Sequence, residues 1–248
     1  MTFDPHSYTP AADLLKDRII MVTGAGDGIG ATAARTFARH GATVALVGRT
    51  QRKLEAVYDA IQEDGGPEPI IAVIDFAKAQ GDDYQNIADA IDQEFGRLDG
   101  VLHNASMLGQ RSPIEHFDSK VWLEVMHVNV NATFLLTQAL LPVLRKAADP
   151  AVVFTSSGVG RTGRAHWGAY AASKFATEGL METLADEEPN MRVNCINPGA
   201  TRTAMRKLAY PAEDPSQLAT AADIMPTYLY LLGPDSAGVS GQSLDCQN

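Results

Sequence analysis

The segment Ile19-Ile-Met-Val-Thr23-Gly24-Ala-Gly26-Asp27-Gly28-Ile29-Gly30 decides the fold of this chain. Its first four residues form an apolar run with the length of a buried strand. Glycines at 24, 26, 28 and 30 follow, and an Ala-rich segment of good helix formers continues to His40. The order strand, glycine turn, helix is the context of a dinucleotide-binding loop. A pyrophosphate can accept hydrogen bonds from the free N–H groups of the first helical turn, and glycine lets it approach the backbone without meeting a Cβ.

Length and composition exclude several classes of protein. The chain has 248 residues, of which 45% are apolar and 20% charged, as in globular proteins. The net charge of −10 argues against a nucleic-acid partner, and the sequence contains no apolar run long enough for a membrane span. The polar start lacks the layout of a secretory signal, and Cys195 and Cys246 show no metal spacing. We therefore expect a cytoplasmic protein without a metal site.

Short apolar runs alternate with helical segments along the rest of the chain. Because these runs are continuously apolar, they predict a parallel sheet buried on both faces. The fold class is therefore α/β, a single Rossmann-type, doubly wound parallel sheet with helices on both faces. Further strands are expected at 43–47, 70–74, 99–103, 151–156, 192–196 and 242–246, and helices at 51–63, 82–95, 118–146, 167–188 and 224–232.

The domain organisation follows from this rhythm. We predict a loose N-terminal arm over 1–13 and one nucleotide-binding domain over 14–248. Residues 200–219 contain Pro211 and Pro215 and break the alternation of strands and helices, which is typical of a substrate-side lid.

A second informative pattern is Tyr170-Ala-Ala-Ser173-Lys174, in which the tyrosine and lysine share one helix face. A free phenol titrates near pH ~10, and a cation held nearby lowers that value. Tyr170 could then give or take the proton of an alcohol, while Ser157 at a strand end could hydrogen-bond the same oxygen. Tyr-x-x-x-Lys alone is a weak motif that also occurs on solvated helices.

Together with Thr23-Gly24-x-x-x-Gly28-Ile29-Gly30, these residues resemble the short-chain dehydrogenase/reductase family over nearly the whole chain. Residues 161–170 and 172–178 look closest to its YciK-type branch. The resemblance implies a catalytic set that includes an asparagine in the preceding helix, which opens that helix locally and holds a water for proton relay. Spacing to Ser157 selects Asn129 for this place and leaves Asn131 with a structural role.

The resemblance also implies which residues contact a nicotinamide dinucleotide. Asp75 and Phe76 look like the adenine-side position, Asn104 and Ala105 like the ribose loop, and Thr203 like a carboxamide contact. His103 and Ser106 depart from the family's usual loop, and His103 is more often a core histidine than a catalyst. The cofactor-binding prediction comprises Thr23, Gly24, Asp27, Gly28, Ile29, Gly30, Arg49, Asp75, Phe76, Asn104, Ala105, Tyr170, Lys174, Pro198, Gly199 and Thr203.

The choice between the two nicotinamide cofactors depends on the end of the second strand. Gly48 stands where a carboxylate would bind the ribose of NAD, and Arg49 follows it. A guanidinium pairs well with a 2′-phosphate, which favours NADP(H) over NAD(H). Asp27 points the other way, because NADP-dependent members of the family often carry a basic residue there. Arg49 could also be an ordinary solvated arginine.

These observations predict an oxidoreductase that transfers a hydride between NADP(H) and a small-molecule carbonyl or secondary alcohol. The alternative is a catalytically silent nucleotide-binding sensor or scaffold. A homodimer or homotetramer formed through the long helices is implied by the resemblance. The residues expected near the substrate are apolar, with arginines at unknown distance: Met107, Leu108, Gly160, Trp167, Met205, Leu208, Arg111, Arg161, Arg164 and Arg206.

Overall fold

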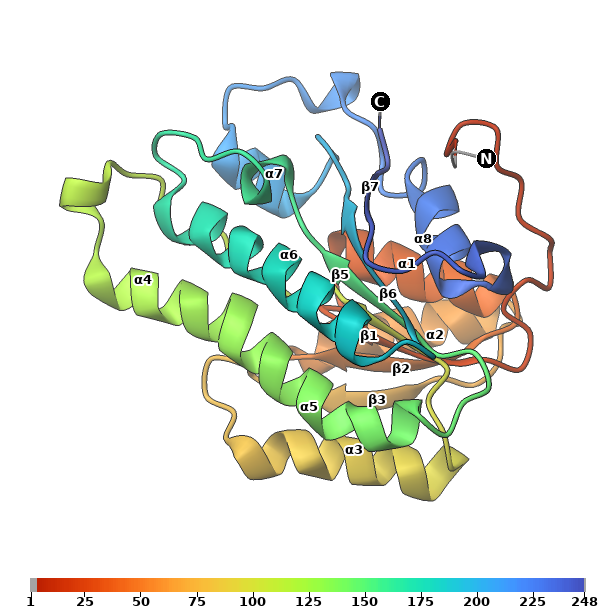
Figure 1. Ribbon diagram of the computed structural model, residues 1–248. Coiled ribbons are helices and arrows are strands. Elements are labelled where there is room, and N and C mark those ends of the chain that lie inside the picture. The colour runs from red at the N-terminus through yellow and green to blue at the C-terminus, as the bar shows by residue number, and fades with distance from the viewer. Residues whose placement is uncertain (1–3, 248) are drawn as a thin grey trace.

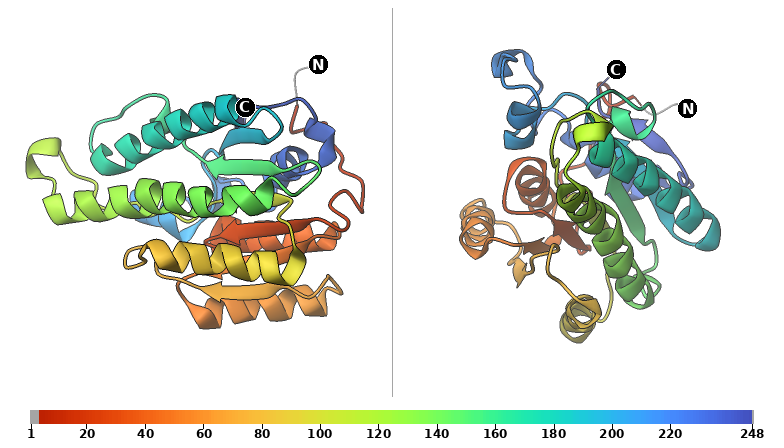
Figure 2. Two further views of the ribbon diagram at one scale, coloured as in Figure 1. Left: turned by 60° about the horizontal axis from the view of Figure 1, so that its bottom comes forward. Right: turned by 90° about the vertical axis from the view of Figure 1, so that its left-hand side faces the viewer.

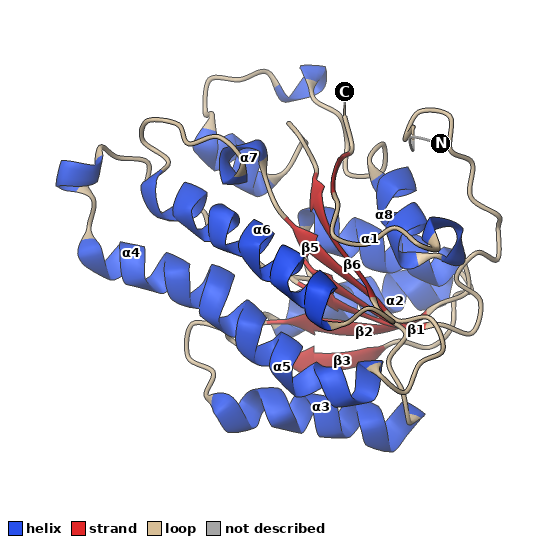
Figure 3. Cartoon of the chain, viewed as in Figure 1, coloured by secondary structure: helices blue, strands red, loops and turns tan. Residues whose placement is uncertain are grey.

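Strand β1 (Ile19–Thr23) lies in the interior of a parallel sheet. The computed structural model describes residues 4–247 and orders the seven strands as β3-β2-β1-β4-β5-β6-β7. β1 pairs with both β2 and β4, so the direction in which strands are added reverses there. In such sheets ligands bind outside the carboxyl ends of the strands at this switch point. Figure 3 shows the strands as one layer surrounded by helices.

Strands and helices alternate along the chain, as labelled in Figure 1. The other strands are β2 (Thr43–Gly48), β3 (Ile70–Val73), β4 (Gly100–His103), β5 (Ala151–Thr155), β6 (Arg192–Asn197) and β7 (Ser243–Asp245). The helices are α1 (Gly28–Arg39), α2 (Gln51–Glu63), α3 (Gly81–Phe95), α4 (Ser119–Met126), α5 (Ala132–Leu144), α6 (Gly168–Glu187), α7 (Ala204–Ala209) and α8 (Met225–Leu232).

Successive residues of the central strand enter opposite hydrophobic cores. Ile20 and Val22 belong to the core shared with α1, α2 and α8, whereas Ile19 and Met21 belong to the core shared with α3, α5 and α6. Side chains alternate across a strand, so a strand buried on both faces is apolar throughout. The predicted doubly wound parallel sheet with helices on both faces is confirmed, and Figure 2 shows both layers.

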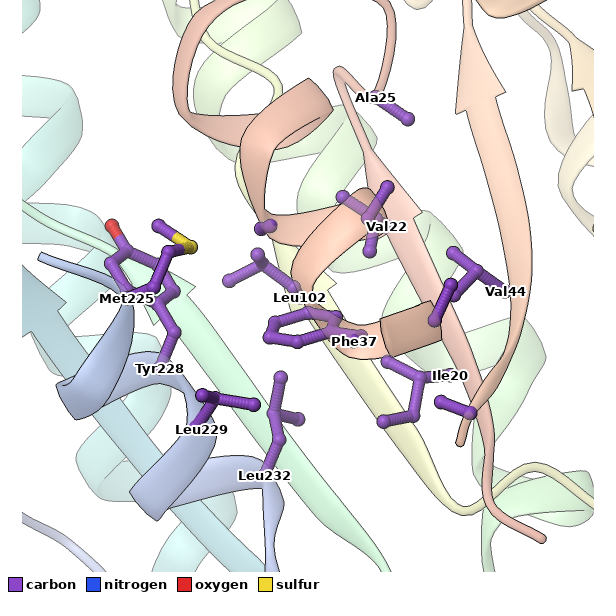
Figure 4. Packing of buried hydrophobic residues seen from close by; sticks show 14 of the residues in the cluster. Ile20, Val22, Ala25, Phe37, Val44, Leu102, Met225, Tyr228, Leu229 and Leu232 are labelled. Carbon is purple, nitrogen blue, oxygen red and sulfur yellow. The ribbon is translucent and has the colours of Figure 1, made fainter. Parts of the chain in front are cut away.

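The first core holds the glycine turn and its helix against the sheet. Figure 4 shows Phe37 of α1 between the strand side chain Leu102 and residues of α8, among them Tyr228 and Leu232. All four residues are fully buried. Burial of one such side chain contributes about 1.5–3 kcal/mol, so this packing holds α1 firmly in place beside β1.

The helix expected over 118–146 differs from the prediction at its centre and its end. It consists of α4, a π-helical segment (His127–Asn131) and α5, and it ends at Leu144. Figure 2 shows the three pieces as one rod. A π-helical turn inserts one extra residue into the α-helical ladder, and neither hydrophobic periodicity nor capping residues signal it.

Two surface segments frame the sheet. Residues 200–219 contain α7 and a 3₁₀ turn (Pro215–Gln217), and a bridge between Thr201 and Ala219 brings the ends of this segment together. The N-terminal arm contacts α8 and the turn after it. The Tyr8 ring packs on Tyr230, and the Tyr8 hydroxyl donates to Asp235 at 2.8 Å. Tyr8 therefore attaches the arm to α8, while most of the other described residues of the arm are exposed.

Candidate active site

The glycine turn is shaped by close contact with the β4 loop. Gly24 has φ +68°, and a Cβ added there would lie 3.0 Å from the Cα of Ala105. A Cβ at Gly30 would lie 2.2 Å from the Gly24 carbonyl oxygen. Gly28 has φ +52° and opens α1, whose first-turn N–H groups lack intrahelical partners. Asp27 caps the helix by accepting from Gly28 N at 2.8 Å. The turn therefore has the form and the free donors that a pyrophosphate requires.

Thr23 and Asn104 join the ends of β1 and β4 at the switch point. The Thr23 hydroxyl accepts from the backbone N–H groups of Asn104 and Ala105, at 2.9 and 3.0 Å. The Asn104 amide in turn donates to the Thr23 carbonyl at 3.3 Å. Thr23 is almost fully buried. Its observed hydrogen bonds thus position the β4 loop beside the glycine turn.

The predicted adenine-side residues have different surroundings. The Asp75 carboxylate accepts from Ala77 N at 3.2 Å and shapes the turn after β3. Phe76 is buried and its ring stacks on Tyr84 at 6.1 Å between centroids. Arg49 is exposed directly after β2, at the same edge of the sheet.

The loop after β6 reaches across to the glycine turn. Gly199 has φ +70°, and its N–H donates to the Asn197 side chain at 3.1 Å. The Gln247 amide donates to the Pro198 carbonyl at 2.6 Å. Thr203 caps α7, and its methyl carbon lies 3.6 Å from the position of a Cβ on Gly28. Two of the predicted cofactor-contacting segments therefore face each other across the carboxyl edge of the sheet.

Ser157, Tyr170 and Lys174 come together at this edge. Ser157 follows β5 and caps a 3₁₀ turn (Gly158–Gly160), while the other two residues lie on α6. The Lys174 ammonium donates to the Thr155 carbonyl at 2.8 Å and stands 5.5 Å from the centroid of the Tyr170 ring. A Cβ at Gly160 would lie 2.8 Å from that of Lys174, so Gly160 serves this packing rather than a pocket.

The protonation of the pair is governed by burial. Burial raises the pKa of Tyr170 to about 12, partly opposed by the hydroxyls of Ser157 and Ser106. Burial lowers the pKa of Lys174 to about 8, although the Cys195 and Glu178 side chains act in the opposite direction. We expected Lys174 to lower the pKa of the phenol. In the structure the net shift of the phenol pKa is upward, because desolvation of the buried phenol is the largest effect.

Asn129 lies in the π-helical segment and connects three parts of the site. Its side-chain oxygen accepts from Met107 N at 2.7 Å, and its amide donates to Met107 O at 2.9 Å and to the Ser173 hydroxyl at 3.0 Å. Asn129 is 3% exposed, so these partners satisfy a buried amide. Asn131, at the end of the same segment, is exposed.

His103 is a core residue, as the sequence favoured. It is buried at the end of β4, stacks on Phe154 at 4.9 Å and contacts the Thr137 hydroxyl at 3.0 Å. Burial lowers its pKa to about 3, so the ring is neutral at physiological pH. A neutral, enclosed imidazole of this kind is part of the packing and not of the chemistry.

An apolar cluster adjoins Tyr170 on the side of α7. It comprises Leu108, Val159, Trp167, Ala171 and Ala209, with Tyr170, Met205 and Tyr210 against it. Leu208, which we expected near the substrate, is 73% exposed.

The arginines expected near this cluster have separate partners. Arg161 pairs with Asp245 at 3.0 Å and Arg206 with Glu213 at 2.6 Å. The Arg111 guanidinium lies 4.7 Å from the Trp167 ring centroid and donates to the Ala209 carbonyl. These contacts attach the arginines to neighbouring segments of the protein itself.

Sequence reasoning missed two residues of this region. The buried Ser106 hydroxyl, which forms no hydrogen bond within the described residues, acts to lower the pKa of Tyr170, although the family pattern gave no reason to expect a hydroxyl there. Lys53 of α2 forms an ion pair with Asp27 at 2.5 Å, and only its place four residues after Arg49 could have indicated it.

Comparison with known proteins identifies the family. A family model described as short chain dehydrogenase matches residues 18–214. The chain belongs to this family. It is 56% identical over 241 residues to the oxidoreductase YciK of Escherichia coli K12, covering 97% of this chain and 96% of that protein. Levodione reductase of Leifsonia aquatica is 32% identical over 231 residues, covering 90% and 85%. The predicted resemblance to short-chain oxidoreductases of the YciK type is confirmed.

Solved structures of similar short-chain dehydrogenases have the same fold. The structure of YciK from E. coli superimposes with a TM-score of 0.96 at 56% identity, covering 98% of this chain and all (100%) of that one. A short-chain dehydrogenase from E. coli CFT073 complexed with NADPH gives 0.95 at 57% identity, covering 96% and 100%. One from Shigella flexneri 2a strain 301 complexed with NADP gives 0.95 at 56% identity, with the same coverage of 96% and 100%.

Over residues 4–247, no helix combines the length and the apolar character that a membrane crossing requires.

Proposed function

We propose that this short-chain dehydrogenase transfers a hydride between NADP(H) and a carbonyl or secondary alcohol, with Tyr170 as general acid and base. The observation that carries the proposal is the meeting of Ser157, Tyr170 and Lys174 beside the switch point, where doubly wound sheets bind their ligands. The similar proteins crystallised with NADPH and NADP support the cofactor assignment.

The residues of the site suit the reduction of a carbonyl. NADPH, when bound, supplies the hydride. Because burial raises the pKa of Tyr170 to about 12, the phenol stays protonated at neutral pH and can donate to the carbonyl oxygen as negative charge develops there. The Ser157 hydroxyl can hydrogen-bond the same oxygen. Lys174 supplies a positive charge near the phenol. This charge stabilises the phenolate that forms when Tyr170 gives up its proton.

The cofactor residues of the proposal lie on facing segments. The glycine turn and the first turn of α1 would hold the pyrophosphate, while Thr203 on the opposite loop would contact the nicotinamide end. Arg49 would pair with the 2′-phosphate, which favours NADP(H) over NAD(H). Asp75, Asn104 and the Pro198 loop remain predicted contacts of the cofactor. The cytoplasmic location expected from the sequence also remains a prediction.

The apolar cluster beside Tyr170 supports a hydrophobic substrate. Leu108, Val159 and Trp167 belong to the cluster against which Tyr170 and Met205 pack. Such a surface favours apolar groups next to the reacting carbonyl. We therefore infer a ketone or secondary alcohol with aliphatic or aromatic substituents.

The experiment that tests the function is isotope transfer. Deuteride from NADPH labelled at C4 is followed into a panel of hydrophobic ketones by mass spectrometry. Tyr170→Phe is expected to bind NADPH normally and to lose about 100-fold or more of the transfer rate. Tyr58→Phe, which removes a distant hydroxyl on α2, serves as the control. Transfer that persists in Tyr170→Phe would contradict the proposed role, and binding without any transfer by the wild type would favour a silent nucleotide-binding protein.

We also infer a homodimer or homotetramer. Three large apolar side chains are exposed on neighbouring helices, with exposed fractions of 67% for Leu123 of α4, 46% for Phe134 of α5 and 46% for Phe175 of α6. Exposed apolar side chains on adjoining elements mark interaction surfaces when they lie together.

A further inference from the structure

Lys53 connects the first turn of α2 to the glycine turn. Its ammonium lies 2.5 Å from Oδ2 of Asp27, and Oδ1 of Asp27 accepts from Gly28 N at 2.8 Å. Both oxygens of the Asp27 carboxylate are therefore engaged. A Cβ on Gly26 would lie only 2.9 Å from that of Lys53. The glycine at 26 gives the lysine stem the space to approach the turn.

A cavity of about 390 Å³ lies at this contact, between α1 and α2. Gly26, Asp27 and Lys53 are among the residues that line it. Arg35 and Arg39 on its wall are both paired with Asp64, at 2.9 Å each. Their charges are thereby directed to the far end of the helices. The ammonium of Lys53 is the cation of this cavity that lies at the glycine turn.

The position of Lys53 relative to Arg49 matters as much as its partner. Arg49 follows β2, and Lys53 lies one turn further on in the helix that starts at Gln51. Both side chains start from the carboxyl edge of the sheet, on the side of β2. A phosphate held between them would also approach Asp27, whose carboxylate repels it unless a cation intervenes. An ammonium has three donors, so Lys53 can keep Asp27 and still donate to a phosphate.

We propose that Lys53 is a specificity-determining residue that binds the 2′-phosphate of NADP(H) together with Arg49 and neutralises Asp27. This inference rests on the proposed function. The cation that is missing from the glycine turn, where Asp27 stands, is supplied instead by α2. NADH has a hydroxyl in place of the 2′-phosphate, so loss of Lys53 affects the phosphorylated cofactor selectively.

The test is calorimetric titration of the purified full chain with NADPH and with NADH. Lys53→Gln keeps the stem on Gly26 and removes the charge. It is expected to weaken NADPH binding about tenfold, as for loss of a hydrogen bond to a charged group, and to change NADH binding less than about twofold. Arg52→Gln, an exposed neighbour in the same turn of α2, is the matched control and is expected to leave both affinities unchanged. The difference between NADPH and NADH should also shrink as salt is raised.

Asp27→Asn separates direct binding from mere neutralisation, because asparagine still caps α1. The double variant Asp27→Asn/Lys53→Gln is expected to bind NADPH about fivefold or more weakly than Asp27→Asn alone. Equal affinities of these two variants would overturn the proposal, as would a Lys53→Gln protein with an unchanged preference for NADPH over NADH. If the wild type bound neither nucleotide, the proposed function itself would fail, and the two failures are therefore distinguishable.

Discussion

At the scale of single residues, Lys174 stands out because it carries a charge into the protein interior. Its relative exposure is 4%, and burial lowers its pKa from 10.5 to about 8. Between these values the unfolded chain holds a proton that the folded protein lacks, so folding stability rises with pH from about 8 to 10.5. Below pH 8 the lysine destabilises the fold by its full amount, about 3 kcal/mol.

Lys174→Met should therefore stabilise the protein at neutral pH while abolishing hydride transfer. We expect a gain of about 2 kcal/mol at pH 7, because loss of the hydrogen bond to Thr155 offsets part of the effect. The gain should fall above pH 8 and vanish before pH 10.5, where the remaining cost of burying the charge no longer exceeds the lost hydrogen bond. Urea unfolding at several pH values measures it, with Lys120→Met on the surface of α4 as control. A less stable variant at pH 7 would show that the ammonium is better solvated than its burial indicates.

The residues that the sequence identified are those fixed by spacing. Tyr170 and Lys174 lie on one helix face whatever surrounds them. Gly24, with its positive φ, and Gly30, with its close backbone neighbour, are recognised from the glycine pattern of the turn. The direction of the Tyr170 pKa shift could not be predicted, because desolvation depends on the neighbours that tertiary packing brings. The role of Lys53 could not be predicted for the same reason, because its partner Asp27 is 26 residues away in the chain.

At the scale of elements, the π-helical segment is the feature on which the site depends. It turns Asn129 toward the loop after β4, where the side chain binds both backbone groups of Met107. Asn129→Ala would leave these buried groups unpaired, so we expect a loss of about 2–4 kcal/mol in the free energy of unfolding. Asn131→Ala, at the exposed end of the same segment, should change it by less than about 0.5 kcal/mol. Denaturant unfolding of both variants decides, and equal losses would contradict a special role for the Asn129 amide.

Helix α7 is held over the apolar cluster by stacked side chains. The Arg111 guanidinium lies 4.7 Å from the Trp167 ring centroid and 5.0 Å from that of Tyr210, and it donates to the Ala209 carbonyl. Arg111→Ala should loosen α7, since cation–π contacts contribute about 0.5–2 kcal/mol each. Hydrogen exchange in residues 204–210 is then expected to accelerate about tenfold or more. Arg164→Ala, a change on the exposed loop before α6, is the control, and unchanged protection in Arg111→Ala would show that α7 is held by its apolar contacts alone.

At the scale of the whole molecule, the fold was largely determined by patterns that the sequence displays. Strands buried on both faces must be apolar throughout, and their alternation with helices leaves a parallel, doubly wound sheet as the natural solution. Ile19 to Val22 illustrate this, because consecutive side chains enter different cores. The packing of Tyr8 on Tyr230 could not be predicted, since the two residues are distant in sequence. The interruption of the long helix at Asn129 was implied by the family resemblance alone and not by the residue pattern.

Assembly is the property of the whole molecule that the exposed side chains address. Leu123, Phe134 and Phe175 occupy α4, α5 and α6, and α4 packs against α6, so they lie on adjoining helices (Figure 1). Phe134→Glu would place a charge at this surface, and burial of an unpaired charge is strongly unfavourable. We expect the variant to sediment as a smaller species than the wild type, with an affinity between subunits lower by at least about tenfold.

Leu208→Glu provides the matched control for assembly, because Leu208 is 73% exposed and belongs to α7, not to these three helices. Removing it lowers surface hydrophobicity to the same degree but leaves the helical surface intact. Analytical ultracentrifugation at several concentrations compares the three proteins. Dissociation by Phe134→Glu alone would locate the subunit interface on α4, α5 and α6. A wild type that sediments as a monomer would show that a second copy of the chain does not cover Leu123, Phe134 and Phe175. A Leu208→Glu protein that dissociates equally would show the same.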